Sequence, residues 1–395
     1  MSNLNYPYSR PNVTENDINS VIKVLRSQFL TQGNVVKDFE NQISKKFNVK
    51  NTIVCNSGTA ALHSVYKCLG LNKKNGLITT PITFLATANA ARMCNAPVYF
   101  ADVDKETGLM TPETLEKAFK EANFKVKVVT VVHLGGHLCD LEELSKVAKK
   151  YNSLLVEDAC HAIGAKYYKK NKKSFFIGSC NYSIACTFSF HAIKNITMGE
   201  GGCITTNDRK LAESIRLNIC HGMTRDKSKM KNISNPPPWF YQMNEIGWNY
   251  RASEISCALG LSQFKKLDKI INEREKIASY YRLALKDNVF IKLPKYNNHK
   301  NAVGWHLYQL KINFTDLGKS RESFVKYLKN KSIGSQVHYI PLIYHPYYKK
   351  NTPINRLEGA VDFYQSTISI PMYNGLKKKY VKYIAKVINN FFERK

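Results

Sequence analysis

The sequence predicts an α/β fold in which a mainly parallel sheet is covered by helices on both faces. Two observations lead to this prediction. Between residues 52 and 230, short β-rich runs alternate with amphipathic helical segments, and these runs are apolar throughout rather than at every second position. The 395 residues also suffice for two or three domains with a large core.

The elements follow in chain order. Residues 1–50 hold a polar start, an apolar spacing typical of a helix at 18–25, and a turn at 30–34. The expected strands are TIVCN (52–56), PVYFADVD (97–104), VVTVVHLGG (128–136), LLVEDA (154–159), ACTFSFH (185–191) and GGCITTN (201–207). The helices expected between them are 58–70, 111–123 and 140–152, the last capped by Asp140.

The second half of the chain is less regular. The lysine-rich residues 166–176 predict an exposed hairpin or loop, and the proline-bearing residues 223–247 predict an irregular lid or interface loop. A long helical pattern covers 252–285. A smaller C-terminal unit is then expected, with strands at 306–313 and 335–341 and helices at 320–331 and 376–393.

The charge balance admits two interpretations. Lysine and arginine number 59 against 30 aspartates and glutamates, a net charge of +29 that is typical of nucleic-acid-binding surfaces. Only 12 of the 59 are arginine, and lysine pairs are spread along the whole chain. A lysine-rich solvated surface is therefore favoured over a nucleic-acid patch, which stays open as the alternative.

Compartment and redox state can also be predicted. The chain opens without a secretory signal, and no window reaches the roughly 18 uninterrupted apolar residues of a membrane span. We therefore expect a cytoplasmic protein with no membrane partner. The ten cysteines include no C-x-x-C pair and mostly sit in apolar runs, so reduced thiols and no metal site are expected.

Lys194 is the first candidate for chemistry. It lies in SFHAIKNITMGEGG (189–202), between a β-rich run and glycines, where a lysine is poorly placed for ordinary surface duty. Such a setting lowers a lysine pKa and favours a nucleophilic amine able to form a Schiff base. The alternative is a strand-end lysine whose ammonium simply reaches water.

Asp158 strengthens that interpretation. It ends the apolar strand LLVE, 36 residues before Lys194, and ligands bind at the carboxyl ends of parallel strands. Pyridoxal phosphate needs a lysine for its aldehyde and a carboxylate for its pyridine nitrogen. A helix cap is the alternative role for Asp158.

A phosphate site is the third element of the pattern. NSGTAALH (56–63) predicts a strand, a Ser-Gly-Thr turn and a helix N-terminus whose free N–H groups can hold a phosphate. With Ser189, Asp158 and Lys194, this turn completes a set of ligands for pyridoxal phosphate in a consistent chain order.

The sequence resembles the DegT/DnrJ/EryC1/StrS family of aminotransferases over nearly its full length. The resemblance is carried by LTQGNVVKDFE, NSGTAALH, PITFLATANAA, VVHLGG, EDACHAIGA, SFHAIKNITMGEGG, WNYRASEISCALGLSQ, HLYQL and SQVHYIPLIYHPYY. It implies fold type I, with a mainly parallel seven-stranded sheet in a large domain. That large domain and the N-terminal segment would span 1–250, and a linking helix and small α+β domain 251–395.

The resemblance also implies roles for individual residues. Lys194 would be the catalytic lysine that binds the cofactor aldehyde and moves the proton. The other expected cofactor ligands are Asp158 at the pyridine nitrogen, Phe84 on the ring face, His161 beside the ring hydroxyl, Gly58, Thr59 and Ser189 at the phosphate, and Asn249 reaching the phosphate of a neighbouring subunit. The expected sugar-nucleotide ligands are Tyr8, Thr31, Gln32, His338 and Tyr339.

Some of these roles have alternatives. His161 could be a packed strand-end histidine, and Tyr8 and Tyr339 could be core or interface aromatics. The role of Asn249 implies a homodimer with shared active sites.

The resemblance implies a substrate class as well. The phrases TFLATANAA, SFHAIK, WHLYQL and QVHYIPLIYHPYY are most similar to members that move an amino group from L-glutamate to C4 of a UDP-4-keto-6-deoxy-N-acetylhexosamine, for pseudaminic acid-type sugars. The alternative within the family is another 4-keto-6-deoxy sugar nucleotide, of the perosamine or bacillosamine type. A catalytically silent basic protein that binds nucleic acid is the alternative from another class.

Overall fold

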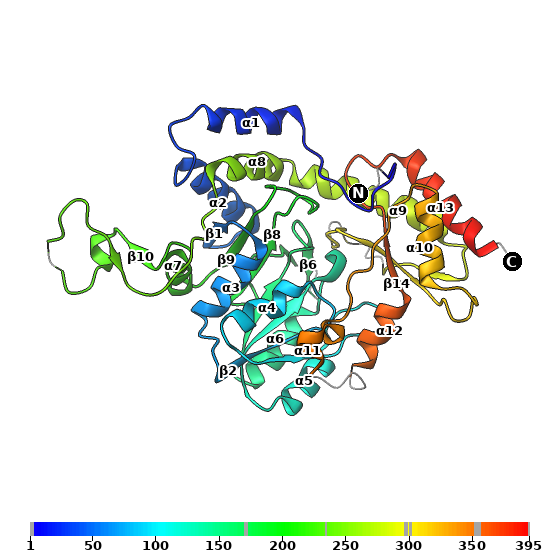
Figure 1. Cartoon of the computed structure of the whole chain (residues 1–395), viewed down its shortest axis with the longest axis horizontal. Helices are drawn as coiled ribbons and strands as arrows, with labels where there is room; N and C mark the ends of the chain where they lie inside the picture. The colour runs from blue at the N-terminus through cyan, green and yellow to red at the C-terminus, as the bar shows by residue number, and fades with distance from the viewer. Residues whose placement is uncertain are drawn as a thin grey trace.

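A seven-stranded sheet forms the centre of the molecule in the computed structural model, which describes residues 4–169, 173–233, 235–295, 299, 302–350 and 357–393 (Figure 1). Across the sheet the strands are β1 (Asn51–Cys55), β9 (Gly202–Thr206), β8 (Ala185–Ser189), β5 (Leu154–Asp158), β4 (Lys125–Val132), β2 (Asn75–Thr79) and β3 (Val98–Phe100). Neighbouring strands are parallel, except that β9 is antiparallel to both β1 and β8. The mainly parallel sheet is as predicted.

Helices cover both faces of this sheet. One face packs in a single apolar core against α2 (Asn34–Phe47), α5 (Pro112–Glu121), α6 (Leu141–Lys150), α8 (Glu254–Lys265) and the start of α9 (Leu267–Leu285). The other face packs against α3 (Gly58–Cys68), α4 (Leu85–Met93) and α7 (Arg209–Asn218). Burial on both faces explains why these strands read as continuous apolar runs.

A second core lies in the C-terminal part of the chain. It is built on a small antiparallel sheet of β12 (Ile291–Lys292), β13 (Tyr308–Ile312) and β14 (Thr367–Ile370), with α10 (Arg321–Asn330), α12 (Glu358–Ser366) and α13 (Lys378–Glu393) nearby. Helix α9 links the two cores, because Ile270 packs in the first and Ile277 in the second. The division of the chain at residue 250 stays a prediction.

Most expected elements are present. The helices predicted at 58–70, 111–123 and 140–152 are α3, α5 and α6, and the Asp140 carboxylate accepts from Glu143 N–H at the start of α6. The helix at 18–25 is α1 (Glu15–Leu25), and those at 320–331 and 376–393 are α10 and α13. The hairpin at 166–176 pairs β6 (Lys166–Tyr168) with β7 (Ser174–Phe176), its tip lying outside the described residues.

Other predictions were wrong or incomplete. Helices α2, α4 and α7 and strand β2 were not predicted, and the helix expected over 252–285 is divided into α8 and α9 at Lys266. No strand forms at 335–341; Gln336 makes a single bridge to Ser369 of β14 instead. The ends of 223–247 are not irregular, since β10 (Met223–Thr224) pairs with β11 (Gln242–Met243).

The described helices include none whose length and apolar content suit a membrane crossing. All ten cysteines are free, and seven of them are buried. The expected cellular compartment stays a prediction.

Candidate active site

A cavity of about 690 Å³ opens where the parallel strands of the large sheet end. Strand β5 supplies Asp158, and β8 supplies Ser189 and leads into the loop that carries Lys194. Ten of the thirteen predicted site residues line this cavity: Tyr8, Gly58, Thr59, Phe84, Asp158, His161, Ser189, Lys194, His338 and Tyr339. Segments from both ends of the chain therefore meet at one site.

Lys194 lies in this cavity on the loop after β8. Its backbone N–H donates to His191 O at 2.9 Å, and the Ser9 hydroxyl donates to Ile193 O at 3.1 Å, so the N-terminal segment helps to fix the loop. Burial lowers the pKa of the Lys194 ammonium, while Asp158 opposes that shift. In the described part of the chain, no hydrogen bond or ion pair engages its Nζ. The amine is therefore available to a ligand.

Asp158 is held in place by two donors. The Thr87 hydroxyl donates to Oδ2 at 2.7 Å, and Cys160 N–H donates to Oδ1 at 3.2 Å. The residues that follow Asp158 form a turn rather than a helix, so the alternative role as a helix cap is not realised. Asp158 is only 5% exposed, and a carboxylate in such a buried position is stable only when hydrogen-bond donors surround it. It can accept one further hydrogen bond from a ligand N–H.

The N-terminus of α3 forms a cradle beside Ser189. Ser57 caps the helix by accepting from Ala60 N–H at 3.0 Å, whereas no partner for the backbone N–H groups of Gly58 and Thr59 is found among the described residues. A Cβ at Gly58 would lie 3.0 Å from Ser189 Cβ, so a side chain there would crowd Ser189. Free N–H groups at a helix N-terminus suit a phosphate.

Histidine and aromatic side chains line the remaining wall of the cavity. The ring of Phe84 is 57% exposed at the start of α4, and its centroid lies 6.1 Å from that of Tyr339. His338 Nδ1 lies 2.8 Å from Ser369 Oγ, and burial lowers the pKa of His338 to about 3. His161 Nε2 lies 3.0 Å from the Tyr339 hydroxyl oxygen on this wall, and both residues line the cavity.

Three predicted residues do not line the cavity of their own chain. Thr31 and Gln32 are exposed in the turn before α2, and Thr31 bridges Ser253 instead. Asn249 is exposed and bridges Cys220. Their expected contacts with ligands are untested, and for Asn249 the position outside the cavity is compatible with the predicted role in a neighbouring subunit.

Sequence reasoning missed several residues of the site. Thr87 donates to Asp158, and its hydroxyl lies 2.8 Å from that of Thr83, but nothing in the sequence marks either contact. His191 and Glu200 flank the cavity mouth with 3.7 Å between Nε2 and Oε1. They lie nine residues apart in a loop, and such a pairing has no sequence signature.

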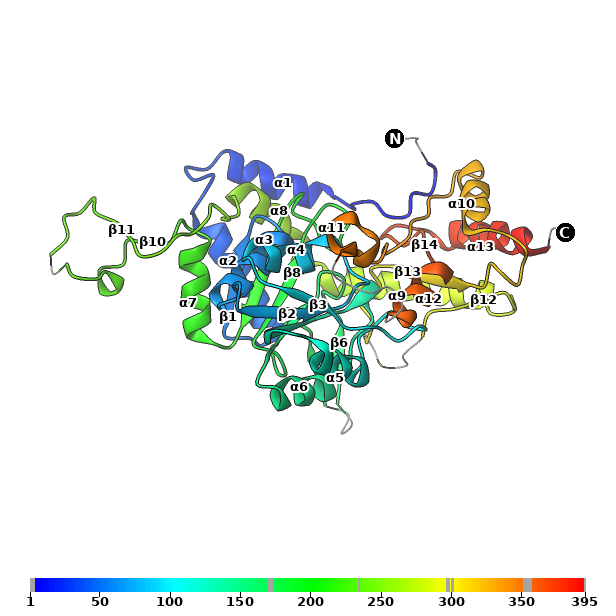
Figure 2. The same ribbon diagram turned by 60° about the horizontal axis from the view of Figure 1, so that its bottom comes forward.

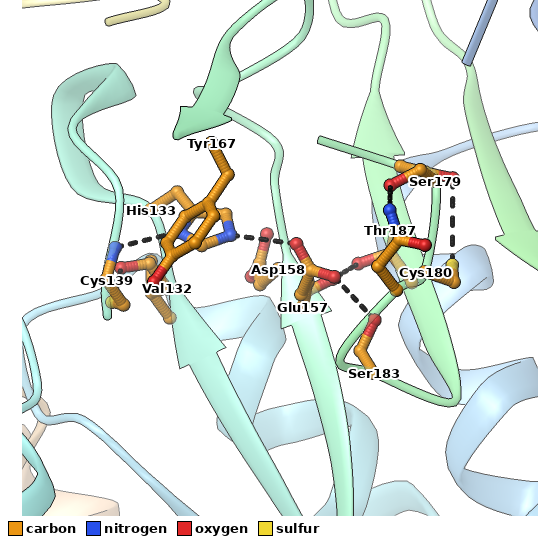
Figure 3. A network of polar contacts seen from close by, with 12 residues as sticks. Val132, His133, Cys139, Glu157, Asp158, Tyr167, Ser179, Cys180, Ser183 and Thr187 are labelled. Atoms are coloured by element: carbon orange, nitrogen blue, oxygen red, sulfur yellow. Dashed lines mark hydrogen bonds and ion pairs between the residues drawn. The ribbon is translucent and has the colours of Figure 1, made fainter. Parts of the chain in front are cut away.

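A second polar network surrounds Glu157, the neighbour of Asp158. Figure 3 shows the Glu157 carboxylate between His133 and Ser183, with the His133 ring also contacting Cys139. Cys139 N–H donates to His133 Nδ1, so the proton of a neutral ring sits on Nε2 and donates to Glu157 at 3.1 Å. The network joins the ends of β4 and β5 to the loop before β8.

The sheet topology and the placement of a lysine, a carboxylate and a helix N-terminus in one cavity define the class of protein: a pyridoxal-phosphate enzyme of fold type I. Residues 11–389 match the DegT/DnrJ/EryC1/StrS aminotransferase family, and the chain belongs to that family.

Individual relatives agree with this assignment. The UDP-4-amino-4,6-dideoxy-N-acetyl-beta-L-altrosamine transaminase of Campylobacter jejuni is 36% identical over 388 residues, which cover 98% of this chain and 97% of that protein. Helicobacter pylori PseC, an aminotransferase of pseudoaminic acid biosynthesis, superposes with a TM-score of 0.86 at 31% identity, over 98% of this chain and 99% of PseC. Spr1654 of Streptococcus pneumoniae in its PLP form gives 0.85 at 25% identity, over 98% of both chains. The protein is thus a pyridoxal-phosphate-dependent sugar aminotransferase.

Proposed function

We propose that this enzyme transfers an amino group from L-glutamate to C4 of a UDP-4-keto-6-deoxy-N-acetylhexosamine, in the synthesis of a pseudaminic acid-type sugar. One observation carries the proposal: the buried amine of Lys194 shares a cavity with Asp158 and the open N-terminus of α3. The names of the Campylobacter and Helicobacter relatives support the sugar.

The residues present fit pyridoxal phosphate. Gly58 and Thr59 N–H groups and the Ser189 hydroxyl would hold the phosphate, and a side chain at Gly58 would fill that space. Asp158 would accept from the pyridine N–H, and Phe84 would cover a ring face. The cofactor supplies an aldehyde for the amino group and a ring that withdraws electrons.

Lys194 would act as the acid and base of the reaction. The lowered pKa increases the fraction of neutral amine near pH 7, and only the neutral amine can attack an aldehyde or accept a proton. Thr87 and Cys160 N–H keep Asp158 oriented, so that its negative charge stays on the nitrogen side of the ring. Tyr8 and His338, which also line the cavity, would contact the sugar nucleotide.

The substrate charge supports a homodimer with shared active sites. Cofactor phosphate and sugar diphosphate together bring about four negative charges, yet of the described residues that line the cavity, Lys194 is the one lysine or arginine. The segment 223–247 carries Arg225, Lys227, Lys229 and Lys231 and exposes 79% of Trp239. Figure 2 shows its β10–β11 ribbon projecting beyond α7, away from the body of the chain. A partner subunit would cover this arm and receive its cations.

The first experiment is a visible absorbance spectrum of the purified protein. We expect a yellow band that bleaches with L-glutamate and returns with the UDP-4-keto sugar. Bleaching with no return would leave the aminotransferase and refute the sugar, after which GDP- and dTDP-linked 4-keto-6-deoxy sugars test the perosamine alternative. If the band returns, the stereochemistry of the amino sugar at C4 distinguishes the proposed product from one of the bacillosamine type. A protein that stays colourless with added cofactor, and whose affinity for duplex DNA falls steeply as the salt concentration rises, would support the nucleic-acid-binding alternative.

The dimer is tested by mixing two inactive variants. Lys194→Ala and Asn249→Ala should each lose activity, and mixed dimers should regain up to about a quarter to a half of it, because one of the two sites then carries both native residues. Equal mixing with no recovery, in dimers verified by sedimentation, would show that Asn249 does not serve the neighbouring site.

A further inference from the structure

A chain of hydrogen bonds with a defined direction runs into the cavity wall. Gly135 N–H donates to His161 Nδ1 at 3.2 Å, and His161 Nε2 lies 3.0 Å from the Tyr339 hydroxyl oxygen. Burial, with Lys194 nearby, holds the pKa of His161 well below its usual range, so the ring is neutral. Because Nδ1 accepts, the single ring proton sits on Nε2 and is donated to Tyr339.

The turn at Gly135, where this series of hydrogen bonds begins, is held in place by its neighbours. Gly135 has a φ of +65°, and a Cβ there would lie 2.6 Å from Gln309 Oε1. Its carbonyl accepts from His306 N–H at 2.9 Å and from Leu307 N–H at 3.1 Å, so the segment after 304 clamps the turn. The His306 ring packs 4.4 Å from the His161 ring, centroid to centroid. His161 therefore has little freedom to turn and reverse the direction.

The series of hydrogen bonds ends at the Tyr339 hydroxyl, a donor without an acceptor. The Tyr339 oxygen accepts from His161, which leaves its own proton to donate, and no acceptor for that proton is found within the described residues. Burial and the nearby Asp158 carboxylate raise the pKa of the Tyr339 phenol, so it keeps its proton throughout the physiological range. Tyr339 is half-buried and lines the cavity, so this donor is available to an acceptor on a ligand.

We propose that Tyr339 donates a hydrogen bond to the 3-hydroxyl oxygen on the pyridine ring of pyridoxal phosphate, here called the ring oxygen. Gly135 and His161 are positioning groups that fix the direction of that bond. The proposal rests on the placement of the cofactor given under the proposed function. The ring oxygen is attached next to the carbon that bears the aldehyde, and Tyr339 lies on the wall near both Asp158 and His161. An anionic oxygen is also the acceptor that gains most from a neutral donor.

The test is a pH titration of the visible absorbance of the bound cofactor, with no amino donor or sugar present. A hydrogen bond to the ring oxygen draws away its negative charge and so weakens its hold on the proton of the nitrogen that joins Lys194 to the cofactor. In Tyr339→Phe the titration midpoint should therefore rise by about one pH unit. The other titratable groups around Tyr339 and His161 are unchanged by this substitution: Lys194, Asp158, Cys160, Tyr8, His306 and His338.

Two variants of His161 test whether this residue orients the Tyr339 hydroxyl or only packs beside it. In His161→Gln the amide oxygen can accept from Gly135 N–H and the amide nitrogen can donate to Tyr339, so the midpoint should stay within a few tenths of a unit. His161→Leu breaks the chain and should move the midpoint in the same direction as Tyr339→Phe, by less. Tyr344→Phe is the matched control, since Tyr344 lies in the same segment but does not line the cavity.

Each outcome decides the matter. An unchanged midpoint in Tyr339→Phe, with cofactor still bound, would overturn the proposal. A variant that keeps the midpoint but binds the sugar nucleotide more weakly would assign the donor to a sugar oxygen, which also overturns it. A wild-type protein that binds no cofactor would refute the proposed function itself, an outcome seen before any variant is titrated.

Discussion

Glu157 and Asp158 are adjacent carboxylates at the end of one strand, yet they belong to two different regions. Successive strand residues point to opposite faces. Asp158 faces the cavity, where its two oxygens accept from Thr87 and Cys160 N–H and can still accept from a ligand. Glu157 faces the network of His133 and Ser183 and is not among the residues that line the cavity (Figure 3).

Two adjacent residues thus have different roles: Asp158 is available to a ligand, and Glu157 stabilises the surrounding structure. On the cavity side, the structure leaves capacity for a further hydrogen bond at Asp158 and an available amine at Lys194. On the other side, donors around Glu157 tie β4 and β5 to the loop before β8. The backbone N–H of His133 also donates to the backbone carbonyl oxygen of Asp158 at 3.1 Å, so the network holds the strand end from which Asp158 projects.

The largest effect is expected from Asp158→Asn. The amide oxygen can still accept from Cys160 N–H, and the amide NH2 can donate to the Thr87 hydroxyl, which can turn to accept. The side chain loses the charge that would hold a protonated pyridine nitrogen, so turnover should fall by about a thousandfold, which corresponds to about 4 kcal/mol. The free energy of unfolding should change by less than about 1 kcal/mol. Steady-state kinetics and urea unfolding measure both. A variant with near-normal turnover would place the cofactor carboxylate elsewhere.

The matched change on the other face should have the opposite profile. Glu157→Ala leaves the buried Nε2–H of His133 unpaired and removes the acceptor of the half-buried Ser183 hydroxyl, and we expect a loss of about 3 kcal/mol in the free energy of unfolding. Glu157→Gln can still accept from His133 and donate to Ser183, so it should lose about 1 kcal/mol. Turnover per folded molecule should stay within a few-fold. A large loss of turnover in a stable Glu157→Gln variant would contradict the division of roles.

The sequence was informative where chemistry leaves a local pattern. Asp158 and Lys194 each follow an apolar strand, and Ser57-Gly58-Thr59 opens a helix, so their meeting at one sheet edge was predictable from the α/β rule. Thr87 and the His133–Glu157 pair were not predicted. Their partners lie 71 and 24 residues away, and a hydroxyl or imidazole in an apolar run gives no sign of which acceptor it meets.

The missed elements have similar causes. Strand β2 contains Gly76, a weak strand former, and it is held by pairing with both β3 and β4 rather than by its own propensity. The apolar run at 335–341 read as a strand, but only Gln336 meets β14, and the segment instead presents His338 and Tyr339 to the cavity. Tertiary placement decided these cases.

The smallest expected effect concerns pH and again separates the two faces. Burial lowers the pKa of His338 to about 3, and that of His306 falls well below its usual range. The unfolded chain binds a proton at each histidine below about pH 6.5, whereas the folded chain does not, so the stability contributed by the neutral histidine is lost as the pH falls below 6.5.

Between pH 7.5 and 5.5, His338 alone should therefore lower the free energy of unfolding by about 1.4 kcal/mol. Urea unfolding at the two pH values, in wild type and His338→Gln, measures this contribution as a difference in slope, which is independent of the baseline stability of the variant. Glu157→Gln changes the other face and should keep the wild-type slope. Equal slopes for wild type and His338→Gln would show that His338 has the same pKa in the folded and unfolded chains, which would contradict a neutral imidazole on the cavity wall at pH 5.5.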